Sequence, residues 1–261
     1  MVTTNDNKVK NGQATFNFSN NISEQAYKDI DKFKNRGIKA KTLFSIKEID
    51  KNTAYAFIKE HHYLKDAKFF SKYSYGLYIE DVLVGCSTFS NPQGISTMKG
   101  WFGLPNTDQS VLELSRLCML PILNGTNATS YLLANSIKLL KSKDVKAVIT
   151  LADSSRHVGS IYQVCNFTYY GLTDKKTDFF CADGRVNPRG QTKDLQGVWL
   201  PRTRKHRYCF LIDKKLKILL DSCLIPSSSC INEKNCCNGE KKVIDKRFNV
   251  VYNCPLCIGN L

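Results

Sequence analysis

The chain has 261 residues, of which 42% are hydrophobic and 11% aromatic, so it carries enough apolar material for a packed core. Its longest nearly uncharged apolar stretch, 147–152, is far shorter than the roughly 20 residues that span a bilayer. The polar N-terminus has no hydrophobic region of a signal peptide. These features exclude a disordered chain and disfavour membrane insertion and secretion, so we expect a cytoplasmic protein with no membrane partner.

The chain is strongly basic, with 38 Lys and Arg against 23 Asp and Glu and a net charge of +15. Such a charge attracts polyanions, and nucleic acid is the first candidate. The alternative is a basic surface that only keeps the protein soluble. Eleven cysteines without a signal peptide indicate a reducing compartment, in which clustered thiols bind metal more often than they form disulfides.

Composition divides the chain into three parts. Residues 1–40 are polar and are predicted to form an extension outside the core, with one short helix over 23–33. Residues 41–220 are predicted to form the main domain. Residues 221–261 are dense in cysteine and are predicted to form a separate small module.

The first half of the main domain is predicted to hold a strand at 41–46, a helix capped by Asp50, and a hairpin. The hairpin joins two β-rich runs, 75–79 and 82–89, across Glu80 and Asp81. Residues 91–110 contain Pro and Gly and are predicted to be a loop.

The second half is predicted to alternate strands and helices: a strand at 111–120, a polar turn at 124–130, a helix at 131–141, a strand at 145–151, a helix at 158–165, and strands at 167–170 and 209–212. This order implies a right-handed parallel crossover. The sequence therefore predicts a mixed α/β fold with a central sheet of about six or seven strands.

The polar turn has the composition of a phosphate-binding site. Small residues at the start of a helix let a pyrophosphate approach unpaired backbone N–H groups. The turn offers such residues at Gly125, Asn127, Ala128, Thr129 and Ser130. An ordinary helix N-cap has the same composition, and that alternative remains open.

The order of hairpin, long strand, small-residue turn, helix, strand, helix and strand resembles the GNAT family of acyl-CoA-dependent N-acyltransferases. The resemblance implies an α/β (α+β) fold with a V-splayed central sheet. It also implies that the 124–130 turn binds acetyl-CoA or a related acyl-CoA.

Three further blocks resemble the Mom family of phage DNA-modification proteins: Leu-Ser-Arg-Leu at 114–117, the segment 152–167, and Lys-His-Arg-Tyr at 205–208. That resemblance implies transfer of a methylcarbamoyl or related acyl group to the N6 amine of adenine in double-stranded DNA, which protects phage or mobile-element DNA from restriction in the bacterial cytoplasm. The resemblance also implies a catalytic iron as a candidate cofactor. The alternatives are a GNAT enzyme acting on a small amine or a protein lysine, and a nucleic-acid-binding protein with an inactive acyltransferase core.

Five residues are candidates for catalysis. Asp153 ends a strand and is expected to orient the amine or take its proton, or else to cap the following helix. The resemblance implies that Tyr162 protonates the departing thiolate, and the alternative is a core aromatic. Arg116 needs a carboxylate or substrate partner, for which Asp153 is the candidate, either as an ion pair or in the active site. His157 is a candidate base or metal ligand, or a loop hydrogen-bonding residue. Ser136 is the weakest candidate, because mid-helix serines usually bond to their own backbone.

Two groups of residues are candidates for DNA contact. His62 and Tyr63 follow a helix and are predicted to stack on an extruded base, although histidines also suit a helix C-terminus. The second group combines four fixed charges with aromatic rings, which suits phosphate contact and stacking, although a solvated charged face is the alternative. It comprises Arg202, Arg204, Lys205, His206, Arg207 and Tyr208.

The C-terminal module is predicted to bind one structural zinc ion. Cys254 and Cys257 form a CxxC pair, and Cys230 with Cys236 or Cys237 supplies the other two thiolates. The segment between the pairs, 241–252, is predicted to form a hairpin. Disulfides and disorder are the alternatives.

Overall fold

The computed structural model describes residues 22–63, 69–94, 97–184, 186 and 195–222, together with the backbone of 243–245 and 250–252. The chain forms two compact units. The first comprises Met1–Phe89 and Ser115–Ser136, and the second comprises Ser90–Leu114 and Ile137–Leu261. The predicted boundaries at 40 and 220 do not coincide with this division.

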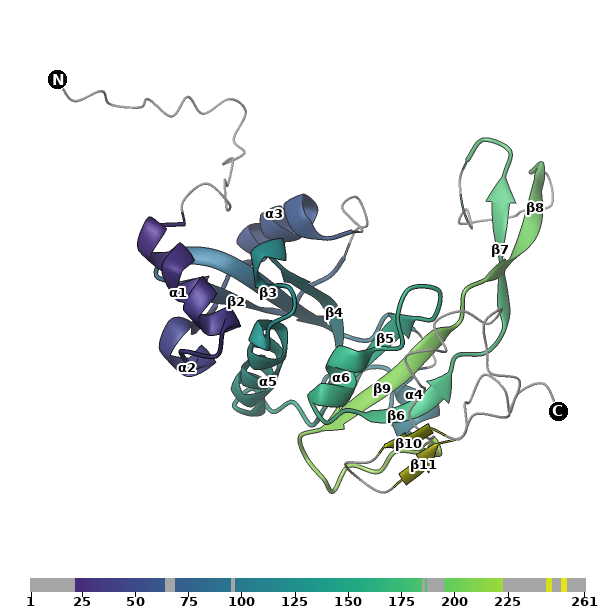
Figure 1. The fold of residues 1–261 in the computed structure, drawn as a ribbon. Helices are drawn as coiled ribbons and strands as arrows, with labels where there is room; N and C mark the ends of the chain where they lie inside the picture. Colours follow the sequence, from purple (N-terminus) through teal and green to yellow (C-terminus); the bar gives the residue numbers. More distant parts are fainter. Residues whose placement is uncertain are drawn as a thin grey trace. The chain divides into compact units, whose positions relative to one another are not determined.

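The elements are labelled in Figure 1. Up to residue 123 they are, in chain order, α1 (Glu24–Lys34), α2 (Ala40–Leu43), β1 (Ser45–Glu48), α3 (Lys51–His61), β2 (Tyr73–Ile79), β3 (Val82–Ser90), α4 (Thr97–Phe102), β4 (Val111–Met119) and the 3-10 turn η1 (Pro121–Leu123). They continue with α5 (Ala128–Lys141), β5 (Ala147–Asp153), α6 (Ser160–Val164), β6 (Thr168–Leu172), β7 (Lys176–Cys181), β8 (Gly197–Arg202), β9 (Lys205–Leu211), β10 (Val243–Asp245) and β11 (Val250–Tyr252).

Seven strands form the main sheet, in the order β1-β2-β3-β4-β5-β9-β6. Strands β4 and β5 are parallel and joined through α5, with Val111–Glu113 beside Ala147–Ile149 at the N-terminal end of each strand. The pairs β1–β2, β2–β3, β5–β9 and β6–β9 are antiparallel. The predicted mixed α/β fold and its parallel crossover are confirmed, and the short parallel register agrees with a splayed sheet.

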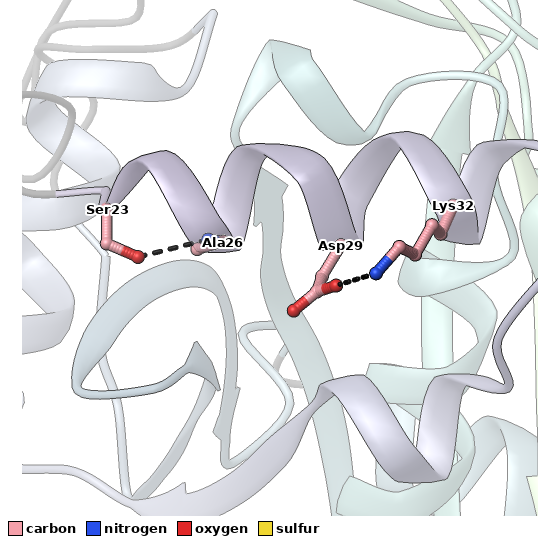
Figure 2. A network of polar contacts seen from close by, with 4 residues as sticks. All are labelled: Ser23, Ala26, Asp29 and Lys32. Atoms are coloured by element: carbon pink, nitrogen blue, oxygen red, sulfur yellow. Dashed lines mark hydrogen bonds and ion pairs between the residues drawn. The ribbon is translucent and has the colours of Figure 1, made fainter.

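Helix α1 was expected to lie outside the core, and this expectation is wrong. Its apolar positions Ala26, Ile30 and Phe33 are buried, and the ring of Phe33 meets that of Phe44 edge-on at 5.0 Å. The Ser23 hydroxyl caps the helix by accepting from the amide of Ala26 at 3.0 Å. Farther along, Lys32 donates to Asp29 at 3.0 Å (Figure 2). The polar composition of 1–40 concealed a helix whose apolar residues recur at positions 26, 30 and 33 of one face.

Two further local predictions are wrong. The strand predicted at 41–46 is replaced by α2 and a strand that begins at Ser45. The predicted loop 91–110 contains α4, whose Met98, Trp101 and Phe102 are buried in the core of the second unit. Large apolar side chains in that loop were the signal for a packed helix.

The C-terminal module lies largely outside the described residues. Strands β10 and β11 pair antiparallel, which confirms the hairpin predicted within 241–252. The predicted zinc ligands Cys230, Cys236, Cys237, Cys254 and Cys257 all fall outside the described residues, so the zinc site stays a prediction. No helix in the described part of the chain is long and apolar enough to cross a membrane.

Candidate active site

Asp153, the last residue of β5, lies in a tight turn that fixes its carboxylate. One carboxylate oxygen accepts from the amide of Ser155 at 3.0 Å and from the Ser155 hydroxyl at 2.8 Å. The other oxygen lies 3.9 Å from Nε of Arg156, and the side chain is 30% exposed. The turn therefore holds a charged oxygen in a partly open position, where it can accept a proton or orient a donor.

His157 follows in the same turn, where its amide donates to the carbonyl of Asp153 at 3.0 Å. Burial lowers the pKa of the imidazole, the Asp153 carboxylate opposes this effect, and Arg156 reinforces it. A histidine with a pKa below its usual 6.5 is neutral at pH 7 and can accept a proton. Asp153 and His157 thus place two proton acceptors in one turn.

Tyr162 lies on α6, and its side chain is largely buried among aromatic rings. Its ring centroid is 5.5 Å from that of Tyr208 and 5.8 Å from that of Phe167. Gly159 lets the chain approach these rings: at φ +77 a Cβ there would lie 2.7 Å from a Tyr208 ring carbon and 2.9 Å from a Tyr162 ring carbon. This packing is what the core-aromatic alternative requires, so the acid role of Tyr162 stays a proposal.

A buried polar pair lies on the neighbouring strands. The hydroxyl of Tyr169 on β6 and Nδ1 of His206 on β9 are 2.9 Å apart. Among the described residues, Nε2 of His206 has no hydrogen-bond partner. Burial lowers the pKa of His206 to about 4, with smaller contributions from His157 and Arg204, while Asp153 opposes them. These effects place His206 within electrostatic range of the Asp153 turn.

His206 and Tyr208 were predicted to contact DNA, and their positions correct that prediction. Both side chains are 0% exposed, so neither can stack on a base in this conformation. The Tyr208 hydroxyl donates to the carbonyl of Val158 and accepts from Nε2 of Gln163 at 3.0 Å. Burial raises the pKa of Tyr208 to about 12. The segment 205–208 is the start of β9, and a strand alternates its side chains, so every second residue of the run points into the core.

The four fixed charges of the same run have different surroundings. Arg202 is exposed and lies 3.7 Å from a carboxylate oxygen of Asp178. Arg204 is partly buried and donates through Nε to the carbonyl of Thr173 at 2.7 Å. Lys205 and Arg207 are partly buried on β9. Of these four charged residues, Arg202 is the exposed one, and DNA contact by the four stays a prediction.

The 124–130 turn, predicted to bind phosphate, belongs to the first unit. Gly125 adopts φ +78, and a Cβ there would meet no atom within 4 Å, so the turn is open at this point. Thr126 closes the turn with its hydroxyl, which donates to the carbonyl of Leu123 at 2.7 Å. Helix α5 begins at Ala128 with no acidic residue in its first turn, although Ser130 bonds back to the carbonyl of Asn127 at 2.9 Å. The amide of Ala128 donates to the Thr126 hydroxyl at 3.2 Å, as in an ordinary N-cap, so pyrophosphate binding by this turn stays a proposal.

Arg116, His62 and Tyr63 also belong to the first unit. The guanidinium of Arg116 lies 5.4 Å from the ring centroid of Phe69 and donates to the carbonyl of Ser115 at 2.7 Å. His62 is buried, and burial together with Arg116 lowers its pKa to about 4. Tyr63 is 56% exposed and stacks on His62 at 4.3 Å. Tyr63 is thus open to solvent, as base stacking requires. Because Asp153 belongs to the second unit, its pairing with Arg116 stays a prediction.

Ser136 lies in the interior of the first unit. It is 0% exposed, and its hydroxyl lies 2.8 Å from the Leu132 carbonyl and 2.8 Å from the Ser87 hydroxyl. Bonding to the carbonyl four residues earlier is the usual behaviour of a mid-helix serine. The structural role explains these contacts, and the catalytic role has no support in them.

Among the described residues, no group of three or more His, Cys, Asp and Glu could hold a metal ion. The described part of the chain therefore does not fit the iron raised by the family resemblance, and we derive no step through a metal.

Sequence reasoning missed three features of this region: the Tyr169 partner of His206, the Thr173 partner of Arg204, and the β7–β8 ribbon. Strands β7 and β8 were hidden because Lys, Asp and Pro interrupt their apolar residues. The available signal was the alternation of Thr177, Phe179 and Cys181, which is typical of a strand with one buried face.

Comparisons with known proteins extend this description. The sequence model described as the Mom protein family matches residues 43–228. No curated protein matches the chain. Among solved structures, the chain is similar to the ribosomal-protein-S18-alanine N-acetyltransferase from Escherichia coli, with 10% identity and a TM-score of 0.42 over 66% of this chain and 95% of that chain. It is also similar to a GNAT family acetyltransferase from Elizabethkingia anophelis with acetyl-CoA bound, with 17% identity and a TM-score of 0.40 over 65% of this chain and 98% of that chain. A putative acetyltransferase from Acinetobacter baylyi is 16% identical, with a TM-score of 0.42 over 69% of this chain and 98% of that chain.

Proposed function

The chain belongs to the Mom protein family, and on this premise we propose that it is an acyltransferase that modifies adenine in DNA. The group transferred is a methylcarbamoyl or related acyl group, and the acceptor is the N6 amine of adenine in double-stranded DNA. The modification protects phage or mobile-element DNA from restriction.

One observation carries this proposal beyond the family match: two proton acceptors occupy one turn at the end of β5. Asp153 offers a partly exposed carboxylate, and His157 offers an imidazole that burial keeps neutral. The N6 amine is a poor nucleophile because its lone pair is delocalised into the ring, so its acylation needs a positioned base. The turn supplies that base from Asp153, held by its bonds to Ser155.

The acyl donor is a coenzyme A thioester, which supplies an activated carbonyl and a thiolate leaving group. Gly125 and the first turn of α5 bind its pyrophosphate through backbone N–H groups, and Thr126 keeps the turn closed. The absence of an acidic side chain from the first turn of α5 leaves the helix N-terminus favourable for an anion.

The reaction needs one proton acceptor and one proton donor, and we assign these roles to Asp153 and Tyr162. As the N6 nitrogen bonds to the acyl carbon, the amine loses one proton, which Asp153 accepts. As the carbon–sulfur bond breaks, the sulfur takes one proton, which Tyr162 donates. Arg116 orients the substrate, and Tyr63 stacks on the extruded base.

The positive net charge of the chain also suits an enzyme that binds DNA. Its net charge of +15 attracts the phosphate backbone, and Arg202 is exposed where it can meet a phosphate. An enzyme acting on a small amine needs no such charge, so the charge favours DNA over a small acceptor.

The test is to express the protein in bacteria, digest the cellular DNA and measure nucleoside masses. We expect a deoxyadenosine heavier by one acyl group, together with resistance of the DNA to restriction enzymes whose sites contain adenine. The control is a strain that carries the empty vector. Unmodified DNA from cells that hold folded, soluble protein would refute the proposal and favour a small-amine acceptor.

A further inference from the structure

The β7–β8 ribbon is a two-stranded element that the proposed chemistry does not use. Its six residue pairs run from Lys176 beside Arg202 to Cys181 beside Gly197. The ribbon continues the β6–β9 pair, since β6 leads into β7 and β8 leads into β9 (Figure 1). Thr173 secures the junction: its amide donates to the carbonyl of Lys205 at 2.8 Å, and its hydroxyl accepts from the Lys205 amide at 2.9 Å.

The base of the ribbon adjoins the Asp153 turn. The amide of Ser154 donates to the carbonyl of Arg204 at 3.1 Å, and Asp153 is the register partner of Lys205. A molecule whose reacting group lies at Asp153 therefore meets the start of the ribbon.

The ribbon exposes an unusual amount of apolar surface. Val198 is 57% exposed, Trp199 58%, Leu200 45% and Phe180 37%. Register places Phe180 beside Val198 and Asp178 beside Leu200, so Phe180, Val198 and Leu200 share one face. Trp199 projects from the other face, where its ring lies 5.2 Å from that of the buried Phe179. Contiguous exposed apolar side chains of this kind mark a binding surface.

Charge identifies the partner as a polyanion. Lys176 and Arg202 are direct register partners, and like charges directly opposite one another destabilise a strand pair. Asp178, 3.7 Å from Arg202, offsets part of that cost, and a phosphate bound beside Lys176 would offset more of it. From 175 to 205 the sequence has eight Lys or Arg and three Asp, so this segment carries a net positive charge. A protein partner with an apolar groove gains nothing from this charge, whereas a phosphate backbone does.

The shape also fits a nucleic acid groove, because the major groove of DNA admits a two-stranded β-ribbon. The N6 amine of a paired adenine is engaged with its partner base, so an enzyme reaches it by extruding the base. Extrusion leaves a gap in the stack, and proteins that unstack DNA fill such gaps with apolar wedges.

We propose that the β7–β8 ribbon enters a DNA groove beside the extruded adenine, with Val198 and Leu200 on one face and Trp199 on the other in contact with the DNA, and with Lys176 and Arg202 on the phosphates. This inference rests on the proposed function, because DNA is the acceptor there. The ribbon sets how the duplex is opened, and the Asp153 turn carries out the chemistry.

The first test uses tryptophan fluorescence. The chain has two tryptophans, and Trp101 is 8% exposed while Trp199 is 58% exposed. In a Trp101→Phe variant of the full chain, an adenine-containing duplex should quench Trp199 and protect it from acrylamide. An unquenched Trp199 at saturating duplex would overturn the proposal, as would quenching by vesicles of anionic phospholipid without quenching by duplex.

The second test compares Val198→Ser/Leu200→Ser with Leu139→Ser, which alters another exposed apolar residue of the second unit. The ribbon variant should bind duplex about tenfold more weakly and lose the fluorescence rise of a 2-aminopurine placed beside the target adenine. Its salt slope should be unchanged, because the proposed phosphate contacts of Lys176 and Arg202 remain. The control should match the parent in all three measurements.

These results separate the two proposals. If the parent modifies DNA and the ribbon variant binds and opens duplex as the parent does, the ribbon proposal fails and the proposed function stands. If duplex binds and quenches Trp199 but the parent leaves every nucleoside unmodified, DNA contact by the ribbon is supported and the proposed chemistry fails.

Discussion

The Tyr169 hydroxyl and the Nδ1 atom of His206 lie 2.9 Å apart in the interior of the second unit, with 1% and 0% of the two residues exposed. Burial keeps this imidazole neutral, so one nitrogen carries a proton and the other accepts. His206 lies on β9 beside Ala152, one position before Asp153. The pair therefore supports the strand that presents the candidate base.

Protonation of His206 should make the folded protein sensitive to acid. Its pKa is about 4 in the folded state, against about 6.5 for an unfolded histidine. The unfolded state alone binds a proton between these values, so the stabilisation is complete above pH 6.5 and is lost as pH falls toward 4. The full effect is about 3 kcal/mol. Urea unfolding from pH 7 to pH 4 should show a shallower loss in His206→Gln than in the parent.

His62 provides an independent check on this linkage, because its pKa is also lowered to about 4. The His62→Gln variant should remove a comparable share of the pH dependence, and the double variant should remove both. An identical pH dependence in the parent and His206→Gln would show that folding does not lower the pKa of His206, and it would contradict this account of the buried imidazole.

Gly159 should tolerate no side chain. An alanine there adopts an unfavourable φ of +77, and its Cβ meets rings of Tyr208 and Tyr162 at 2.7 and 2.9 Å. We expect Gly159→Ala to lower the free energy of unfolding by about 2 to 4 kcal/mol, measured in urea. Gly184→Ala is the matched control: its φ is +85 with no atom within 4 Å, so it should lose only about 1 kcal/mol. Equal losses would contradict the predicted ring contact.

A Ser136→Ala variant tests whether the Ser136 hydroxyl on α5 has a structural or a catalytic role. Removing the hydroxyl leaves the buried Ser87 hydroxyl without this partner, so we expect a loss of about 1 to 2 kcal/mol in unfolding free energy. The modification rate per folded molecule should stay within twofold of the parent. A rate reduced a hundredfold at unchanged coenzyme affinity would instead establish Ser136 as catalytic.

Gly125→Ala tests the coenzyme-binding turn. The added methyl group meets no protein atom but occupies the open space where the pyrophosphate would approach the backbone. Calorimetric titration should show coenzyme A binding weakened about tenfold, with duplex binding unchanged. Gly103→Ala, also at positive φ, should bind coenzyme A as the parent does. Unchanged binding by Gly125→Ala would remove this turn from the proposed site.

The central strands and helices were predictable because their signals are local. The hairpin of β2 and β3, the long strand β4 and the amphipathic α5 all carry periodic apolar residues, and the structure contains each within a few residues of its predicted bounds. The Asp153 position followed from the end of a buried strand before a polar turn.

The remaining features depend on tertiary contacts that periodicity does not reveal. A run of charges around His206 and Tyr208 indicates a surface in sequence, yet pairing of β9 with β5 and β6 buries both residues. Helix α1 has a polar composition, and packing of Phe33 on Phe44 places it in a core. The bond between Tyr169 and His206 joins residues 37 positions apart, and no local pattern indicates it.

The central claim is that Asp153 is the base in acyl transfer to adenine, and an Asp153→Asn variant tests it most directly. Asparagine keeps a side-chain oxygen for the Ser155 amide and hydroxyl, so the turn is preserved while the base is lost. Asp108→Asn is the matched control, because Asp108 accepts from the Ser110 amide at 2.7 Å and the Ser110 hydroxyl at 2.6 Å in the same kind of turn.

The measurement is the amount of acylated deoxyadenosine formed by each purified protein with an acyl-CoA and duplex DNA, determined by mass after digestion. We predict a loss of at least a hundredfold for Asp153→Asn, at unchanged duplex affinity and unfolding free energy, and parental activity for Asp108→Asn. Parental levels of acylated deoxyadenosine from folded Asp153→Asn would contradict the account.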